Sequence, residues 1–259
     1  MRWTETLTAA YEVFPSAPPP FAGAPYRPRP LVTPYAGAER WKCSVYYFWW
    51  EYLRRHEGYR ETCANGGSGE FASLFRDFGD IHSTDFPTWW WQHLQLFTVV
   101  GDVRLARDPV LARKKLRPGH LLVEIPFART TAQMTRVIRR ELEEVMRAGL
   151  RVKMLDVIPY VPAARCYLPS LHDHLRVWDA RQQNPTAGPA ELADLIELDV
   201  KLPYDTEDIQ RLRDDGLPVR DLERHNSRVK QLAVQRHLRI AQQYIENVGL
   251  GQFPVRKRR

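Results

Sequence analysis

Arginine side chains recur at helical spacing near the end of this 259-residue sequence. Arg220, Arg224 and Arg228 are four residues apart, so a helix would place them on one face. Guanidinium groups bind phosphate through charge and paired hydrogen bonds, and Leu222 and Val229 predict an opposite face that packs on the protein. The residues of this helix predicted to contact nucleic acid are Arg220, Arg224, Arg228, Lys230, Arg236 and Arg239.

A second basic set lies near the middle of the sequence, just ahead of a predicted strand. It consists of Arg113, Lys114, Lys115 and Arg117. In a loop close to aromatic residues, such a set could hold nucleic acid by charge and stacking. An exposed loop without a ligand explains it equally well.

The charge of the chain is separated into blocks. The formal net charge is +7, but residues 101–160 carry +6, residues 161–216 carry −5 and residues 217–259 carry +7. The local field decides what a surface attracts, so the last block favours a nucleic-acid partner, either DNA or RNA. The alternative is that this basic block only neutralises the acidic block beside it.

Aromatic residues are concentrated in residues 41–97, which hold 16 of the 29 in the chain. Successive residues of a helix turn by about 100°, so adjacent Trp rings cannot share one face. Rings that face a second surface are typical of an interface with a partner or a second copy; a helix buried all round is the alternative. The predicted partner-binding residues are Trp49, Trp50, Trp89, Trp90 and Trp91.

Residues 177–212 contain a helix, a turn and a second helix: Val177–Arg181, Asn184–Gly188 and Ala190–Ile196. This segment resembles helix-turn-helix DNA-binding domains, which implies that a third helix enters the groove. That third helix is acidic here, with Asp205, Glu207, Asp208, Asp214 and Asp215. Phosphate repels such a helix, so either the basic helix that follows binds DNA or the segment is ordinary helical packing.

Catalytic patterns are weak. Asp77, Asp80, His82 and Asp85 could bind the metal of a nuclease, but helix caps and turns explain these residues better. The three cysteines lack the paired spacing of a zinc site. We predict no catalytic residue, metal or cofactor, and therefore a protein that is not an enzyme.

The expected fold class is α+β and predominantly α-helical, with a small β-α-β element in the middle and an all-α C-terminal domain. Helices are expected at 39–59, 70–78, 87–97, 171–183, 189–196, 206–214 and from Pro218 to about 247. The β-α-β element is expected at 120–127, 132–148 and 152–161. The predicted domains are a Pro-rich extended arm (1–35), an aromatic-rich domain (36–160) and a basic helical domain (161–259). Residues 15–34 of the arm hold eight of the 20 prolines in the chain.

Three cysteines form no disulfide framework, and the N-terminus does not resemble a signal peptide. No apolar run reaches the roughly 20 residues that cross a membrane, so a cytoplasmic protein is expected. The predicted function is non-enzymatic nucleic-acid binding, with a protein partner or self-association as a further expectation. An adaptor or assembly subunit that uses the aromatic module and the arm is the alternative, and a metal-dependent nuclease is less favoured.

Overall fold

The chain divides into two compact units, neither of which is continuous in sequence. The strand unit comprises Met1–Pro15 and Gln95–Pro159, and the helical unit comprises Ser16–Leu94 and Tyr160–Arg259. The computed structural model describes residues 7–21, 32–105, 130, 132–133, 135–136, 138–140, 158–164 and 166–255.

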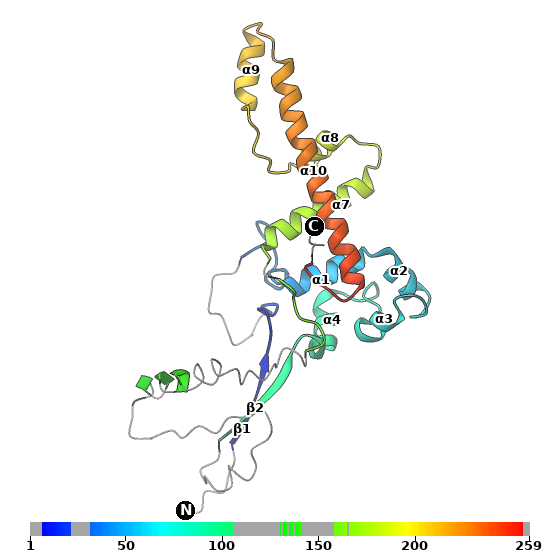
Figure 1. Cartoon of the computed structure of the whole chain (residues 1–259), viewed down its shortest axis with the longest axis vertical. Coiled ribbons are helices and arrows are strands. Elements are labelled where there is room, and N and C mark those ends of the chain that lie inside the picture. Colours follow the sequence, from blue (N-terminus) through cyan, green and yellow to red (C-terminus); the bar gives the residue numbers. More distant parts are fainter. Residues whose placement is uncertain are drawn as a thin grey trace, which may run out of the picture. The chain divides into compact units, whose positions relative to one another are not determined.

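Two strands are described in the strand unit, and the sequence analysis predicted neither of them. β1 (Leu7–Val13) and β2 (Val99–Leu105) pair antiparallel, with Leu7 opposite Leu105 and Val13 opposite Val99 (Figure 1). The alternation of apolar and charged residues through Asp102 to Leu105 was a usable signal for β2. This alternating segment is short, and the strand that pairs with β2 lies some 90 residues away in the sequence.

The predicted α+β fold class is wrong. The helical unit is all-α in its described residues, and the described chain contains no β-α-β element. The predicted strand at 120–127 and most of the one at 152–161 lie outside the described residues, but residues 158–161 are described and are not a strand. Pro159 and Pro162 explain this, because each removes a donor that a central strand needs.

The first half of the helical unit is a run of short helices. These are η1 (Arg40–Lys42), α1 (Val45–Arg54), α2 (Glu57–Ala64), α3 (Ala72–Phe78) and α4 (Phe86–His93), with η2 (Leu94–Leu96) at the unit's boundary. The single helix predicted over 39–59 is therefore divided. The break is at His56, whose Nδ1 accepts a hydrogen bond from the Tyr59 backbone N–H at 3.1 Å and so begins α2.

These helices enclose an aromatic core. Trp49 and Tyr52 of α1 are fully buried, and their rings lie 5.7 and 5.1 Å from the ring of Phe253 near the C-terminus. Trp89 of α4 is also buried, and its indole N–H donates to the Phe78 carbonyl at 2.7 Å. The core therefore joins the two ends of the unit's sequence.

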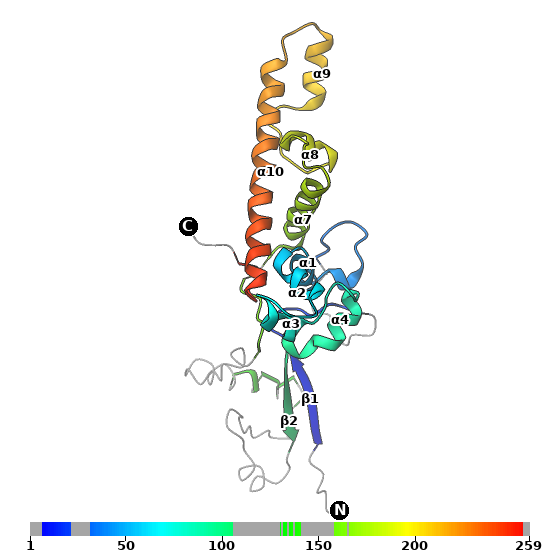
Figure 2. The ribbon, with the colours of Figure 1, turned by 90° about the vertical axis from the view of Figure 1, so that its right-hand side faces the viewer.

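The second half contains α7 (Leu168–Gln183), α8 (Pro189–Leu195), α9 (Thr206–Asp214) and α10 (Arg220–Gly249). α10 passes α8 and α7 and reaches α1, while α9 lies beside its N-terminal half (Figures 1 and 2). A small core of Val177, Ala180, Leu192, Ala193 and Val234 joins α7, α8 and α10. The third helix of this cluster is thus α10, whereas the helix-turn-helix resemblance implied α9.

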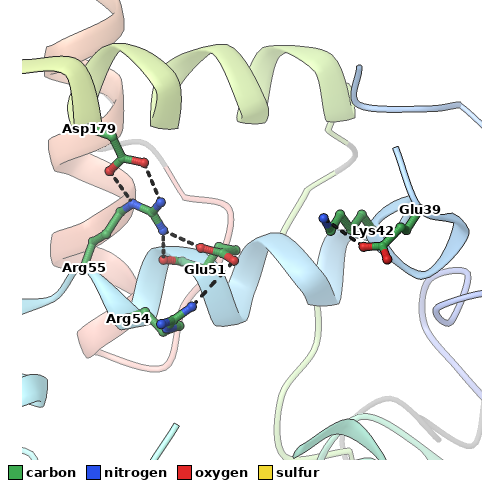
Figure 3. Close-up of polar contacts among 6 residues, drawn as sticks. All are labelled: Glu39, Lys42, Glu51, Arg54, Arg55 and Asp179. Atoms are coloured by element: carbon green, nitrogen blue, oxygen red, sulfur yellow. Dashed lines mark hydrogen bonds and ion pairs between the residues drawn. The ribbon is translucent and has the colours of Figure 1, made fainter. Parts of the chain in front are cut away.

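A half-buried ion-pair network ties α1 to α7 (Figure 3). The Arg55 guanidinium donates to both carboxylate oxygens of Asp179, at 2.7 and 2.5 Å, and to the Glu51 carboxylate at 2.6 Å. This two-pronged geometry is the strongest that an arginine makes with a carboxylate. It joins the C-terminal end of α1 to α7, on which α10 packs.

Candidate nucleic-acid interface

One face of α10 is buried and the opposite face is exposed. Val234, Ala241 and Val248 are fully buried, whereas the predicted phosphate-binding arginines of this helix are all exposed. At about 100° per residue these arginines fall within an arc of roughly 160°. We call this set the Arg face: Arg220, Arg224, Arg228, Arg236 and Arg239.

Among the described residues, few acidic side chains pair with the Arg face. Arg224 pairs with Asp221 on the same exposed face at 3.3 Å. For the other four arginines, no acidic partner occurs among the residues that the structure describes. Exposed pairs such as Arg224–Asp221 contribute at most about 1 kcal/mol, so water or an anion can replace Asp221 at little cost.

Lys230 lies apart from this face. Its side chain is only 22% exposed and pairs with Asp194 of α8. The sequence grouped it with the arginines because it is basic and close to them. In the structure, Lys230 joins α10 to α8 through this ion pair.

The acidic residues of α9 pair mainly within α9. Arg211 lies 3.7 Å from Glu207 and 3.2 Å from Asp208, and the Asp205 carboxylate accepts from the Glu207 backbone N–H at 2.8 Å. The ion pair between α9 and α10 joins the cation Arg213 on α9 to the carboxylate of Glu223 on α10. In the described residues, the acidic block therefore does not neutralise the Arg face.

The other predicted site residues lie in several places. Trp49, Trp50, Trp89 and Trp90 are buried in the core of the helical unit, with exposures of 0 to 4%. Trp91 is 61% exposed, and its ring lies 5.4 Å from that of Phe21 in the Pro-rich arm. The basic set at 113–117 is outside the described residues.

Each carboxylate of the Asp77–Asp85 segment accepts a hydrogen bond within the helical unit. Asp77 accepts from the Tyr160 hydroxyl at 2.5 Å, and Asp80 accepts from the His82 backbone N–H at 2.9 Å. Asp85 caps α4 through the Thr88 N–H at 2.8 Å, and hydrogen bonds from the side chain and the backbone of Thr88 lower the pKa of its carboxyl. In the described part of the chain, no three His, Cys, Asp or Glu side chains are placed to share a metal ion.

The sequence analysis missed a histidine pair and a cavity beside it. Nδ1 of His174 on α7 lies 2.9 Å from Nδ1 of His237 on α10. His174 also lines a cavity of about 380 Å³, together with Cys166 and Tyr244. The 63-residue separation of the two histidines left no signal in the sequence.

The cavity shows no activated nucleophile. Burial raises the pKa of the Cys166 thiol to about 11, so the thiol is protonated at neutral pH. The thiolate is the reactive form of cysteine. The exposed charge of the Arg face is therefore the better candidate for a functional site.

No known protein family matches this sequence, and neither does any characterised protein or solved structure. In the described part of the chain, no helix has both the length and the apolar character needed to cross a membrane.

Proposed function

We propose that this protein binds nucleic acid through the Arg face of α10 and carries out no chemistry of its own there. One observation carries the proposal: four of the five arginines have no acidic partner among the described residues, although an acidic helix lies beside α10. A purely solvated basic face needs no such separation of charge. A phosphate backbone would bind these unpaired arginines favourably, because binding releases the counterions of the nucleic acid.

A fluorescence-anisotropy titration with labelled DNA and RNA oligonucleotides tests this proposal. We expect binding tighter than about 10 μM that weakens as salt increases, since weaker affinity is ordinary non-specific attraction. The variant Arg228→Gln/Arg236→Gln/Arg239→Gln should weaken binding by about tenfold or more, which corresponds to roughly 0.5 kcal/mol or more for each arginine.

A matched control removes the same charge elsewhere in the helical unit. Arg60, Lys201 and Arg211 are exposed and lie outside the Arg face. The variant Arg60→Gln/Lys201→Gln/Arg211→Gln should bind nearly as well as the unaltered protein. If the two triple variants lose equal affinity, net charge alone drives the association and the Arg face is not a site.

The adaptor alternative now depends on a smaller surface. With four of the five predicted tryptophans in the core, the exposed ring of Trp91 and its neighbour Phe21 remain to contact a partner. Light scattering during size exclusion, together with a pull-down from the native host, discriminates between the two functions. A monomer that retains no protein argues against the adaptor.

A cytoplasmic location forms part of the proposal. Cys43, Cys63 and Cys166 are all free thiols. Free thiols persist most readily in a reducing compartment, which supports this location.

A further inference from the structure

The Arg face lies along one continuous helix, α10. Arg220 and Arg239 are 19 residues apart in the sequence, which corresponds to about 28 Å at 1.5 Å per residue. Its opposite side is fixed to the protein, because Val234 packs in a core with α7 and α8 and Tyr244 packs against Tyr52 of α1. The charges therefore form a rigid row. A duplex is an equally rigid array, with about 16 phosphate charges along the same length.

Among the residues that the structure describes, the exposed surface of α10 lacks the aromatic platforms that hold single strands. Proteins that bind a single strand stack successive bases on aromatic side chains in a basic groove. The exposed positions of α10 carry no Phe, Trp or Tyr, but Asp221, His225, Leu232, Gln235, Gln242 and Glu246 beside the arginines. In the described part of the chain, the ring of Tyr204 lies near the N-terminal end of α10, edge to face with His225 and with the two ring centroids 5.7 Å apart.

An anionic membrane is the competing partner for a basic helix, and the structure disfavours it. Interfacial helices insert an apolar face into the bilayer. The apolar face of α10 is already buried against α7, α8 and α1, and Leu232 is the one large apolar residue exposed on this helix. On these grounds, and resting on the proposed function, we infer that the Arg face binds duplex nucleic acid in preference to single strands.

The dependence of the binding affinity on salt concentration can be predicted from the number of phosphates contacted. For duplex DNA, the logarithm of the affinity falls with the logarithm of salt concentration by about 0.9 for each phosphate contacted. Five arginines predict a slope of roughly −4 to −5. The variant Arg228→Gln/Arg236→Gln/Arg239→Gln should reduce the slope by about 2.7, and the same three positions changed to Lys should retain it.

The experiment uses the full chain and three fluorescent probes: a 20-base-pair DNA duplex and each of its strands. Affinity is measured by anisotropy between about 50 and 200 mM salt. We expect the duplex to bind at least about tenfold more tightly than either strand. Circular dichroism of each variant confirms that α10 is intact, and vesicles containing phosphatidylserine are tested in parallel.

The possible failures are distinguishable. Salt-dependent binding in which a strand equals or exceeds the duplex overturns the inference and leaves the proposed function standing. Failure of all three DNA probes to bind tighter than about 10 μM overturns the inference; the proposed function also falls if the RNA oligonucleotides do not bind. Vesicle binding as tight as duplex binding would assign the Arg face to anionic surfaces in general, and would overturn both.

Discussion

Arg55 joins α1 to α7 through charged hydrogen bonds. Its guanidinium is 23% exposed and makes two bonds to Asp179, on a helix that lies more than 100 residues further along the chain. Replacing Asp179 with Ala leaves the half-buried cation with Glu51 alone. We expect Asp179→Ala to lower the free energy of unfolding by about 1–3 kcal/mol, because a partly buried charge loses its bonds. Urea denaturation measures this loss.

The Lys42–Glu39 pair provides the control, and Figure 3 shows both sites. Its atoms approach to 2.9 Å, but Glu39 is 59% exposed, so water competes for the contact. Lys42→Ala should cost less than about 1 kcal/mol. Equal losses in the two variants would show that the Arg55 network is no stronger than an ordinary surface pair.

At the residue scale, the sequence reveals contacts between near neighbours and hides those between distant ones. The cap of α4 by Asp85 could be anticipated, because a helix cap acts over three residues. The sequence did not indicate the Arg55–Asp179 pair or the His174–His237 pair, because each joins residues that only tertiary packing brings together.

Gly249, the last residue of α10, shows how closely one element packs on another. A Cβ atom added to Gly249 would overlap the ring of His56, which begins α2. Ala favours a helix over Gly by about 1 kcal/mol, but overpacking in a filled site costs about 1–3 kcal/mol. We therefore expect Gly249→Ala to destabilise the protein, which thermal unfolding followed by circular dichroism would detect as a lower Tm.

Gly188, the N-cap of α8, is the matched control. Its backbone is ordinary, with φ of −65°, and an added Cβ would meet nothing within 4 Å. Gly188→Ala should change stability by at most about 0.5 kcal/mol. A Gly249→Ala protein as stable as this control would mean that His56 moves aside freely.

At the element scale, apolar periodicity predicted α7, α8, α9 and α10 because each has one buried and one exposed face. It failed at residues 39–59, where apolar residues continue through the break between α1 and α2. A histidine ends one helix and starts the next there, and neither Gly nor Pro marks the place. The predicted end of the last helix, about residue 247, lies close to its observed end at Gly249, but the packing of Gly249 against His56 was not foreseeable.

At the scale of the whole molecule, the candidate site could be found from the sequence because it is one helix with a local repeat. The sequence could not show whether acidic neighbours already neutralise the charges of that site. That depends on the neighbouring acidic residues, which pair mainly within α9, and on Lys230, which faces away toward α8. The β1–β2 pairing was missed for a related reason: its two strands come from distant parts of the chain.

Four histidines of the helical unit make its stability depend on pH. Burial lowers the pKa of His56, His82, His172 and His237 below the ordinary 6.5. Because unfolding raises each pKa back toward 6.5, the unfolded chain binds more protons as the pH falls below that value. The free energy of unfolding is therefore highest above about pH 6.5 and falls below that pH, by at most about 1.4 kcal/mol per pH unit for each histidine. These rings are partly exposed, so solvent screening lowers that limit.

The urea midpoint should accordingly fall between pH 7.5 and pH 5.5, and His237 offers the sharpest test. Its Nδ1 lies 2.9 Å from that of His174, so the pair needs one donor and one acceptor, and a proton on both rings would leave two donors facing each other. Arg236 opposes protonation of His237, and Asp173 favours it less strongly than burial resists it. His237→Asn should therefore flatten the pH dependence. A midpoint in the unaltered protein that is constant or rises on acidification would show that these buried rings already carry their protons when folded.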